Sequence, residues 1–142
     1  MNQAVEKIVV FFETLTPQSV SRLGEFYTED AYFKDPFNEV RGLKAVERVF
    51  AHMFDALHEP RFVITARVVD GDQCFLSWDF HFRFKKFKPE ASQTIRGATH
   101  LKLAADGRVR FHRDYWDAAE ELYEKLPVVG GLMRWLKKRA NS

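Results

Sequence analysis

Residues 76–85 alternate strictly between apolar and polar side chains, and this pattern limits the fold more than any other. The apolar positions are Leu76, Trp78, Phe80, Phe82 and Phe84. Because successive side chains of a strand point to opposite faces of a sheet, the pattern predicts a strand with one apolar face and one polar face. With a rise of roughly 3.3 Å per residue, a strand that covers all of residues 76–85 is long. Long strands bend or coil. We therefore expect a bent sheet around an aromatic interior.

Composition indicates one globular domain over residues 1–142. Of these 142 residues 46% are hydrophobic, which is enough for a proper core. Aromatic residues make up 15% of the chain, which favours an aromatic core or an aromatic-lined cavity. A net charge of +2 gives no electrostatic case for a nucleic-acid partner. Cys74 is the only cysteine, as suits a reducing compartment. We also find neither a signal peptide nor a membrane-spanning apolar run. We therefore expect a cytoplasmic protein.

The N-terminal part of the chain has helical periodicity. Apolar spacing predicts helices over residues 2–14, 17–27 and 43–57. Thr16-Pro17 is typical of an N-cap that is followed by a first-turn proline. A short strand over residues 31–34 should end at Asp35-Pro36, because the residue before a proline disfavours helix.

The rest of the chain predicts antiparallel strands and then a helical extension. The expected strands cover residues 61–69, 76–85, 92–103 and 108–116, with turns at Asp70-Gly71-Asp72 and Ala105-Asp106-Gly107. Residues 118–126 and a basic segment up to Arg139 predict C-terminal helices. A basic amphipathic helix can lie on an anionic membrane. We favour a helix that covers the mouth of the sheet or packs on a second copy in a homodimer.

Three short motifs carry a resemblance to a known fold. Glu25-Phe26-Tyr27-Thr28-Glu29-Asp30-Ala31, then Lys34-Asp35-Pro36-Phe37, then Asp106-Gly107-Arg108-Val109 with Tyr115-Trp116 occur in order. Over about residues 3–118 the chain resembles the cone-shaped α+β fold of nuclear transport factor 2, ketosteroid isomerases and SnoaL-like polyketide cyclases. The resemblance implies a strongly bent antiparallel or mixed sheet wrapped around three N-terminal helices.

The likeness to ketosteroid isomerases assigns roles to several residues. Asp35 falls where these enzymes place their general-base aspartate. Phe11 falls at the position of the oxyanion-hole tyrosine, and Thr99 at that of the protonated acid. Tyr27 matches a second pocket tyrosine, whereas Phe50 replaces a third. Since phenylalanine donates no hydrogen bond and threonine only a neutral one, the resemblance argues against steroid isomerisation by this route.

The last expected strand offers a second arrangement. Alternation places His112, Asp114 and Trp116 on one face. SnoaL-like cyclases resemble this pattern, because their acid/base aspartate lies on the same late strand. In such chemistry a carboxylate removes a proton α to a carbonyl group. The resemblance gives this role to Asp114, with His112 able to orient it or to share the proton.

Each assignment has a structural alternative. Asp35 could cap the turn after its strand, and Asp114 could pair across the sheet, for example with Arg96. His112 could be an ordinary hydrogen-bonded core histidine. The histidines lack metal-ligand spacing with a carboxylate, so we expect no metal and no cofactor.

These patterns together predict a hydrophobic pocket with inward carboxylates. The expected function is carboxylate-mediated proton transfer on a hydrophobic carbonyl compound, as in an isomerase or a cyclase. The alternatives are a noncatalytic module that binds a hydrophobic small molecule and an adaptor with an exposed apolar patch. The expected catalytic residues are Asp114, Asp35 and His112. The expected substrate-binding residues are Trp116, Tyr27, Phe11, Phe50, Trp78, Phe80 and Thr99.

Overall fold

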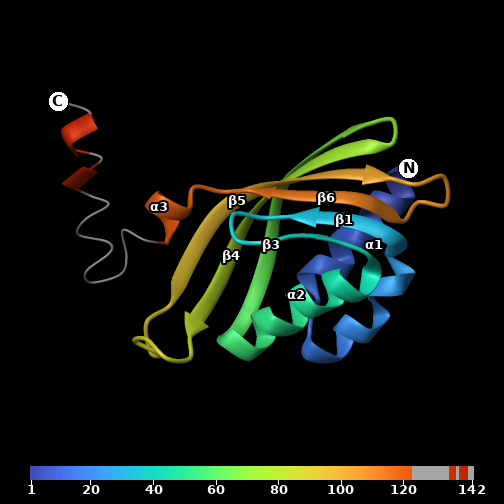
Figure 1. Cartoon of the computed structure of the whole chain (residues 1–142). Helices are drawn as coiled ribbons and strands as arrows, with labels where there is room; N and C mark the ends of the chain where they lie inside the picture. The colour runs from blue at the N-terminus through green and yellow to red at the C-terminus, as the bar shows by residue number, and fades with distance from the viewer. Residues whose placement is uncertain (123–134, 137, 141–142) are drawn as a thin grey trace.

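A mixed, curved sheet covered by helices on its concave side forms the molecule (Figure 1). The computed structural model describes residues 1–122, 135–136 and 138–140. The elements are α1 (Asn2–Glu13), the 3-10 helix η1 (Pro17–Glu25), β1 (Tyr27–Lys34), β2 (Glu39–Arg41), α2 (Leu43–Ala56), β3 (Leu57–Asp70), β4 (Gln73–Phe84), β5 (Gln93–Leu103), β6 (Val109–Tyr115) and α3 (Ala118–Glu121). The predicted α+β class is confirmed.

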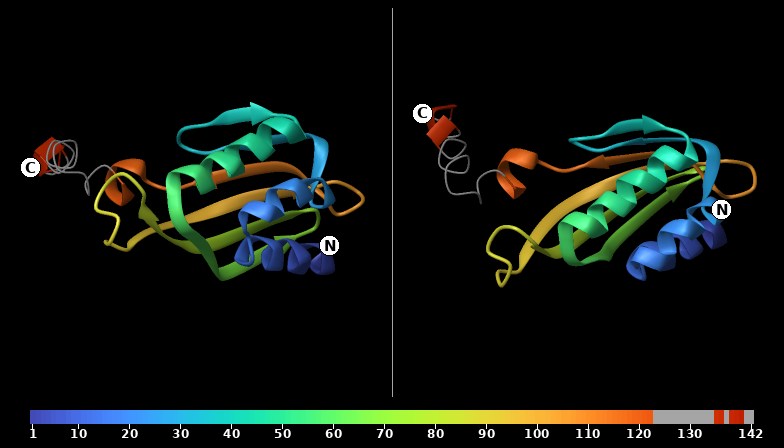
Figure 2. Two further views of the ribbon diagram at one scale, coloured as in Figure 1. Left: turned by 90° about the horizontal axis from the view of Figure 1, so that it is seen from below. Right: turned by 60° about the horizontal axis from the view of Figure 1, so that its bottom comes forward.

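The six strands are ordered β2-β1-β6-β5-β4-β3. β1 runs parallel to β6, and the other neighbours are antiparallel. Figure 2 shows the long strands β3, β4 and β5 bending around α2. α1 contacts β3, and α2 contacts both β1 and β3, so the two helices bridge the concave side of the sheet.

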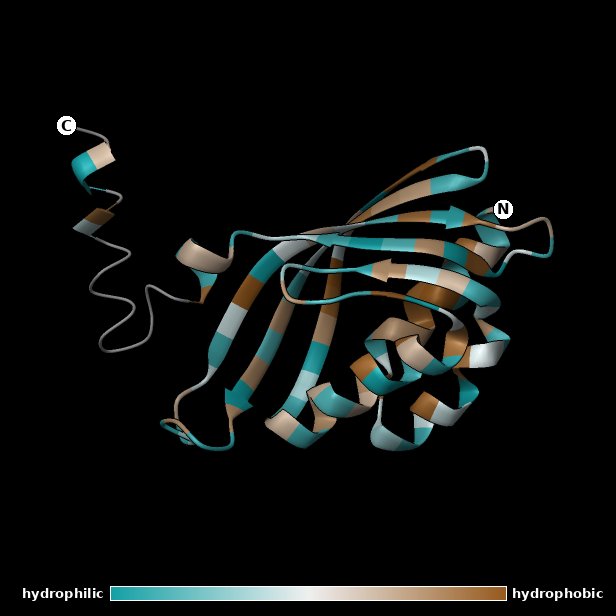
Figure 3. Ribbon diagram, in the orientation of Figure 1, coloured by the Kyte–Doolittle hydropathy of each residue, from teal (hydrophilic) through white to brown (hydrophobic). Residues whose placement is uncertain are grey.

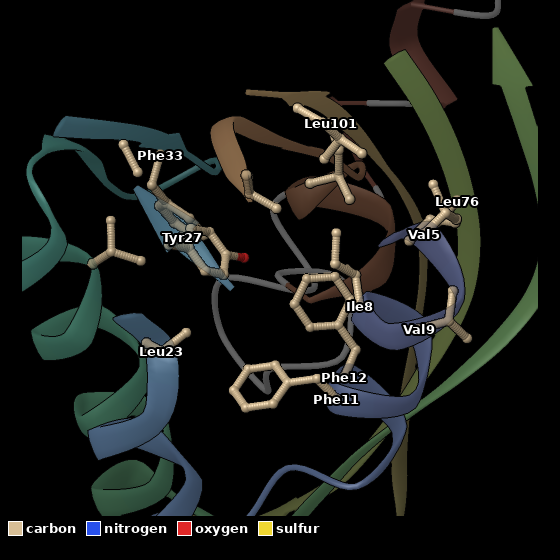
Figure 4. Close-up of a cluster of buried hydrophobic side chains, with 14 of the residues drawn as sticks. Val5, Ile8, Val9, Phe11, Phe12, Leu23, Tyr27, Phe33, Leu76 and Leu101 are labelled. Carbon is tan, nitrogen blue, oxygen red and sulfur yellow. The ribbon is translucent and has the colours of Figure 1, made fainter. Parts of the chain in front are cut away.

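The main core lies where α1, η1 and β1 meet the inner face of the sheet. Hydropathy alternates along the strands in Figure 3, as one-sided burial requires. Each fully buried large apolar side chain contributes about 1.5–3 kcal/mol relative to an exposed one. Figure 4 shows part of this cluster, which includes Val5, Ile8, Val9, Leu23, Tyr27, Leu76 and Leu101.

The sequence prediction differs from the structure between η1 and β2. The predicted second helix is a 3-10 helix that ends at Glu25, and β1 begins at Tyr27 instead of residue 31. Serine and glycine are weak helix formers, and η1 contains both. Thr16 and Ser19 form a capping box at its start. β2 was not predicted, because three residues are too few to show an alternation.

β3 begins earlier than the predicted residue 61. It continues through Pro60, at a point where its register with β4 shifts between His58 and Arg61. Proline lacks the N–H that a central strand needs, but edge strands and bulges tolerate it. β3 is an edge strand, so Pro60 interrupts the ladder without ending the strand.

The C-terminal extension is described only in part. α3 covers the first turn of the helix predicted over residues 118–126, and its N-cap Asp117 accepts a hydrogen bond from the backbone N–H of Glu120. Most of the predicted basic helix lies outside the described residues. Within the described ranges, no helix is both long enough and apolar enough to cross a membrane.

Gly97 is a steric requirement of the sheet. It lies opposite Trp78 in the β4–β5 register, and a Cβ built there would come within 2.6 Å of the Trp78 ring and 2.9 Å of the Tyr115 carbonyl oxygen. We expect Gly97→Ala to lower the free energy of unfolding by about 1–3 kcal/mol through overpacking, measured by urea denaturation. In the control Gly71→Ala, a Cβ meets nothing within 4 Å, but φ is +61°. That control should cost about 1 kcal/mol from backbone strain alone. An unchanged or raised stability of Gly97→Ala would contradict the steric argument.

Candidate active site

A cavity of about 320 Å³ lies between the inner face of the sheet and α2. This volume is at the lower end of the range for small-molecule sites. Most of its lining is apolar and aromatic, and a small polar group lies among these side chains. The apolar lining includes Phe12, Phe33, Phe37, Phe50, Phe62, Trp78, Phe80, Phe82, Phe84, Ile95 and Trp116. The polar lining consists of Asp35, Asn38, His52, Thr99, His112 and Asp114.

A chain of hydrogen bonds connects five side chains from four strands. Trp78 Nε1 lies 2.7 Å from Thr99 Oγ1, which lies 2.6 Å from Asp114 Oδ1. The same carboxylate oxygen lies 2.7 Å from His112 Nε2. His112 Nδ1 lies 2.6 Å from the Tyr27 hydroxyl. The pairing of β5 with β6 sets Thr99 opposite Asp114, so the sheet register itself aligns the centre of this chain.

The direction of each hydrogen bond follows from the donors. The Trp78 indole can only donate, so the Thr99 oxygen accepts from it and the Thr99 hydroxyl donates to Asp114. If His112 is neutral with its proton on Nε2, it donates to Asp114 and accepts from Tyr27 at Nδ1. Every polar hydrogen in the chain then has an acceptor, and the final acceptor is an ionised Asp114 carboxylate.

Aromatic rings hold the His112 imidazole in place. His112 is 4% exposed, and its ring lies 4.6 Å from the Phe33 ring and 5.9 Å from the Phe12 and Tyr27 rings, centroid to centroid. Tyr27 is completely buried. Burial, and then the charge of Asp114, raise the pKa of the Tyr27 phenol well above its ordinary value. Tyr27 therefore stays a hydrogen-bond donor over the whole neutral range.

Asp114 has one oxygen held and one oxygen available. Oδ1 accepts from Thr99 and His112, whereas Oδ2 accepts no hydrogen bond from any residue that the structure describes. The side chain is 16% exposed and lines the cavity. Such a carboxylate is fixed in orientation and open to a ligand.

Asp35 is placed differently, although it also lines the cavity. Its Oδ1 accepts from the backbone N–H groups of Phe37 at 2.8 Å and Asn38 at 2.6 Å. The Asn38 side-chain amide contacts both carboxylate oxygens, at 3.1 and 3.2 Å. This is the turn-capping geometry that aspartate favours, so the turn role and the pocket position coexist at Asp35.

The cavity holds most of the predicted site residues. Phe50, Trp78, Phe80, Thr99 and Trp116 line it. Tyr27 lies behind His112 and reaches the cavity only through that side chain.

Phe11 does not line the cavity but packs on Phe26, with ring centroids 4.1 Å apart. His52 and Asn38 line the cavity but were not predicted as site residues. His52 lies three positions after Val49 on α2, a spacing that could have placed it beside the apolar stripe.

The electrostatics of the site are one-sided. The described lining contains two aspartates and no lysine or arginine. No group of three or more His, Cys, Asp or Glu side chains is placed to hold a metal ion within the described ranges. The cavity therefore presents a ligand with the oriented Asp114 carboxylate beside an aromatic wall.

Replacing Tyr27 with phenylalanine tests the buried end of the hydrogen-bond chain. We expect Tyr27→Phe to lower the free energy of unfolding by about 1–3 kcal/mol near neutral pH, because His112 Nδ1 loses its donor. The unfolded chain ionises this phenol near 10.0, whereas the folded state holds its pKa higher. The contribution of Tyr27 is thus fully present below that pH and is lost as pH rises toward the folded-state pKa. Urea denaturation of both proteins should show the stability gap closing above about pH 10. A gap that is constant with pH would contradict this account.

Comparison with known proteins identifies related structures. A putative SnoaL-like polyketide cyclase from Shewanella putrefaciens CN-32 is 24% identical, with a TM-score of 0.70 over 86% of this chain and 97% of that chain. A hypothetical protein with a ketosteroid isomerase-like fold from Catenulispora acidiphila DSM 44928, solved in complex with trimethylamine, is 16% identical, with a TM-score of 0.71 over 84% and 88%. An LEH-like epoxide hydrolase from M. tuberculosis is 15% identical, with a TM-score of 0.66 over 84% and 79%. At these identities the similarity shows the shared fold.

A search of curated protein sequences found no match. The sequence profile of the SnoaL-like domain matches residues 8–112. That segment covers well over half of the chain, from within α1 to His112 on β6. The protein therefore belongs to the family of SnoaL-like domains.

Proposed function

We propose that the protein is a small-molecule enzyme in which Asp114 accepts a proton from a hydrophobic carbonyl compound. The observation that carries the proposal is the state of the Asp114 carboxylate. One oxygen is held by Thr99 and His112, and the other is without a hydrogen bond among the described residues. The family match ends at His112, so the role of Asp114 is supported by geometry and by the resemblance of the last strand.

The proposed step breaks a C–H bond α to a carbonyl group. The proton passes to Asp114 Oδ2, and the bonding electron pair becomes part of an enolate. Return of the proton to another carbon gives an isomer. Attack of the enolate carbon on a second carbonyl group gives a ring, and the protonated Asp114 then returns the proton to the new alkoxide.

The identity of the carbonyl compound is limited by the hydrogen-bond donors. Trp78, Thr99, His112 and Tyr27 all use their polar hydrogens inside the chain that ends at Asp114. An enolate in this cavity therefore gains little stabilisation from them. A substrate that delocalises the charge itself, through a second carbonyl group or an aromatic ring, suits such a site best.

Hydrogen–deuterium exchange tests the proposal directly. A panel of hydrophobic diketones and aryl ketones is incubated with the protein in D₂O, and loss of the α-proton signal is followed by NMR. We expect catalysed exchange with at least one compound and a loss of about 100-fold or more in Asp114→Asn, since asparagine cannot take up the proton. Asp79→Asn, a mid-strand change outside the cavity lining, should retain the rate. Exchange that survives in Asp114→Asn but disappears in Asp35→Asn would transfer the role of base to Asp35.

Ketosteroid isomerisation provides a second, independent test. We expect turnover of a β,γ-unsaturated ketosteroid to stay at least about 100-fold below that of a ketosteroid isomerase assayed in parallel. The reason is that Phe11 is outside the cavity lining and the Thr99 hydroxyl is committed to Asp114. A spectrophotometric assay of the conjugated product measures this. Turnover equal to that of the isomerase would reveal an oxyanion donor elsewhere, with His52 the first to substitute.

The second candidate function is noncatalytic binding of a hydrophobic small molecule. It is favoured by the committed donors of the site, because binding requires no stabilisation of an enolate. Native mass spectrometry of the purified protein separates the two functions. A retained compound, together with a complete lack of exchange across the panel, would support the binding module over the enzyme.

A further inference from the structure

The cavity contains a carboxylate with no lysine or arginine beside it in the described lining. Within the described lining there is no lysine or arginine, and the two groups that donate to Asp114 are a hydroxyl and an imidazole. A doubly protonated His112 would supply a positive charge. It would also turn Nδ1 into a donor and remove the acceptor of the buried Tyr27 hydroxyl. The Tyr27 contact is satisfied by a neutral imidazole, and with that imidazole Asp114 has no charged partner in the described lining.

An unpaired carboxylate beside apolar space carries a desolvation cost. Asp35 avoids most of that cost, because backbone N–H groups and an amide surround it. At Asp114 only one oxygen is hydrogen-bonded by the described residues, and the other is open to the cavity. A positively charged N–H group placed at Oδ2 would both complete the hydrogen bonding and neutralise the charge.

The walls of the cavity suit the same kind of group. Trp116, just past the end of β6, lines the cavity together with Trp78 and Phe33. Aromatic faces attract organic cations by about 0.5–2 kcal/mol, most strongly where water is excluded. An anionic ligand would find no opposite charge and would face repulsion from two aspartates.

We propose that this cavity binds hydrophobic ammonium ions, with the ligand N–H donating to Asp114 Oδ2 and the apolar body lying against the aromatic wall. The proposal goes beyond proton transfer, because it concerns the charge of a ligand bound at equilibrium. The ammonium N–H occupies the place that an acidic C–H takes in the proposed reaction. Such amines should therefore compete with a carbonyl substrate.

A matched series of ligands tests the proposal with the full chain. Tryptamine, tryptophol and indoleacetate share one aromatic body and differ mainly in a cationic, neutral or anionic end. Binding is measured by isothermal titration calorimetry at pH 7 and low salt. We expect tryptamine to bind about tenfold or more tightly than tryptophol, and indoleacetate to bind most weakly. Asp114→Asn should reduce the tryptamine preference to less than about threefold, whereas Asp79→Asn, outside the cavity lining, should keep it.

Several results would overturn the proposal. These are equal binding of tryptamine and tryptophol by the wild-type protein, tighter binding of indoleacetate, no detectable tryptamine binding, or a preference that persists in Asp114→Asn. The wild-type series decides the question even if Asp114→Asn fails to fold. Since no step depends on turnover, absent hydrogen–deuterium exchange would remove the proposed enzyme function and leave this inference standing.

Discussion

The close approach of Trp78 to Gly97 is the constraint on which the site depends. Only a residue without a side chain lets the indole ring lie this near the backbone of β5. From that position Nε1 reaches Thr99, whose own hydroxyl is then directed to Asp114. The packing of β4 against β5 thus positions the Thr99 hydroxyl that donates to Asp114 on β6, so the packing and the chemistry of the cavity cannot be separated.

The same register explains why a charged group can lie at this depth. Hydrogen bonds to neutral donors offset part of the cost of burying a carboxylate, and they do so on one oxygen only. The buried Tyr27 anchors the far end, because its raised pKa keeps it a donor to His112. The parallel pairing of β1 with β6 brings these two residues together from opposite ends of the chain. The oriented carboxylate is therefore a product of tertiary structure.

Periodicity in the sequence correctly predicted several features of the sheet. The alternation over residues 76–85 correctly predicted which face of β4 is buried, and parity alone grouped His112, Asp114 and Trp116. Periodicity could not reveal β2, nor that β3 continues through Pro60, because both depend on pairing with a neighbouring strand. The same limit applies to Phe11. Spacing matched it to a pocket tyrosine, but the rotation of α1 directs it against Phe26.

Asp35 and Asp114 show why residue type alone does not define a site. Both are aspartates that line one cavity. Their hydrogen bonds differ. Asp35 accepts hydrogen bonds from the backbone of the turn that follows it. Asp114 keeps one oxygen open, because both of its donors contact the other oxygen. A carboxylate acts as a base, or as a counter-ion, only through an oxygen that a ligand can reach. The chemistry of this cavity is accordingly set by β6, which presents Asp114, and by the hydrogen-bonded side chains on β1, β4 and β5.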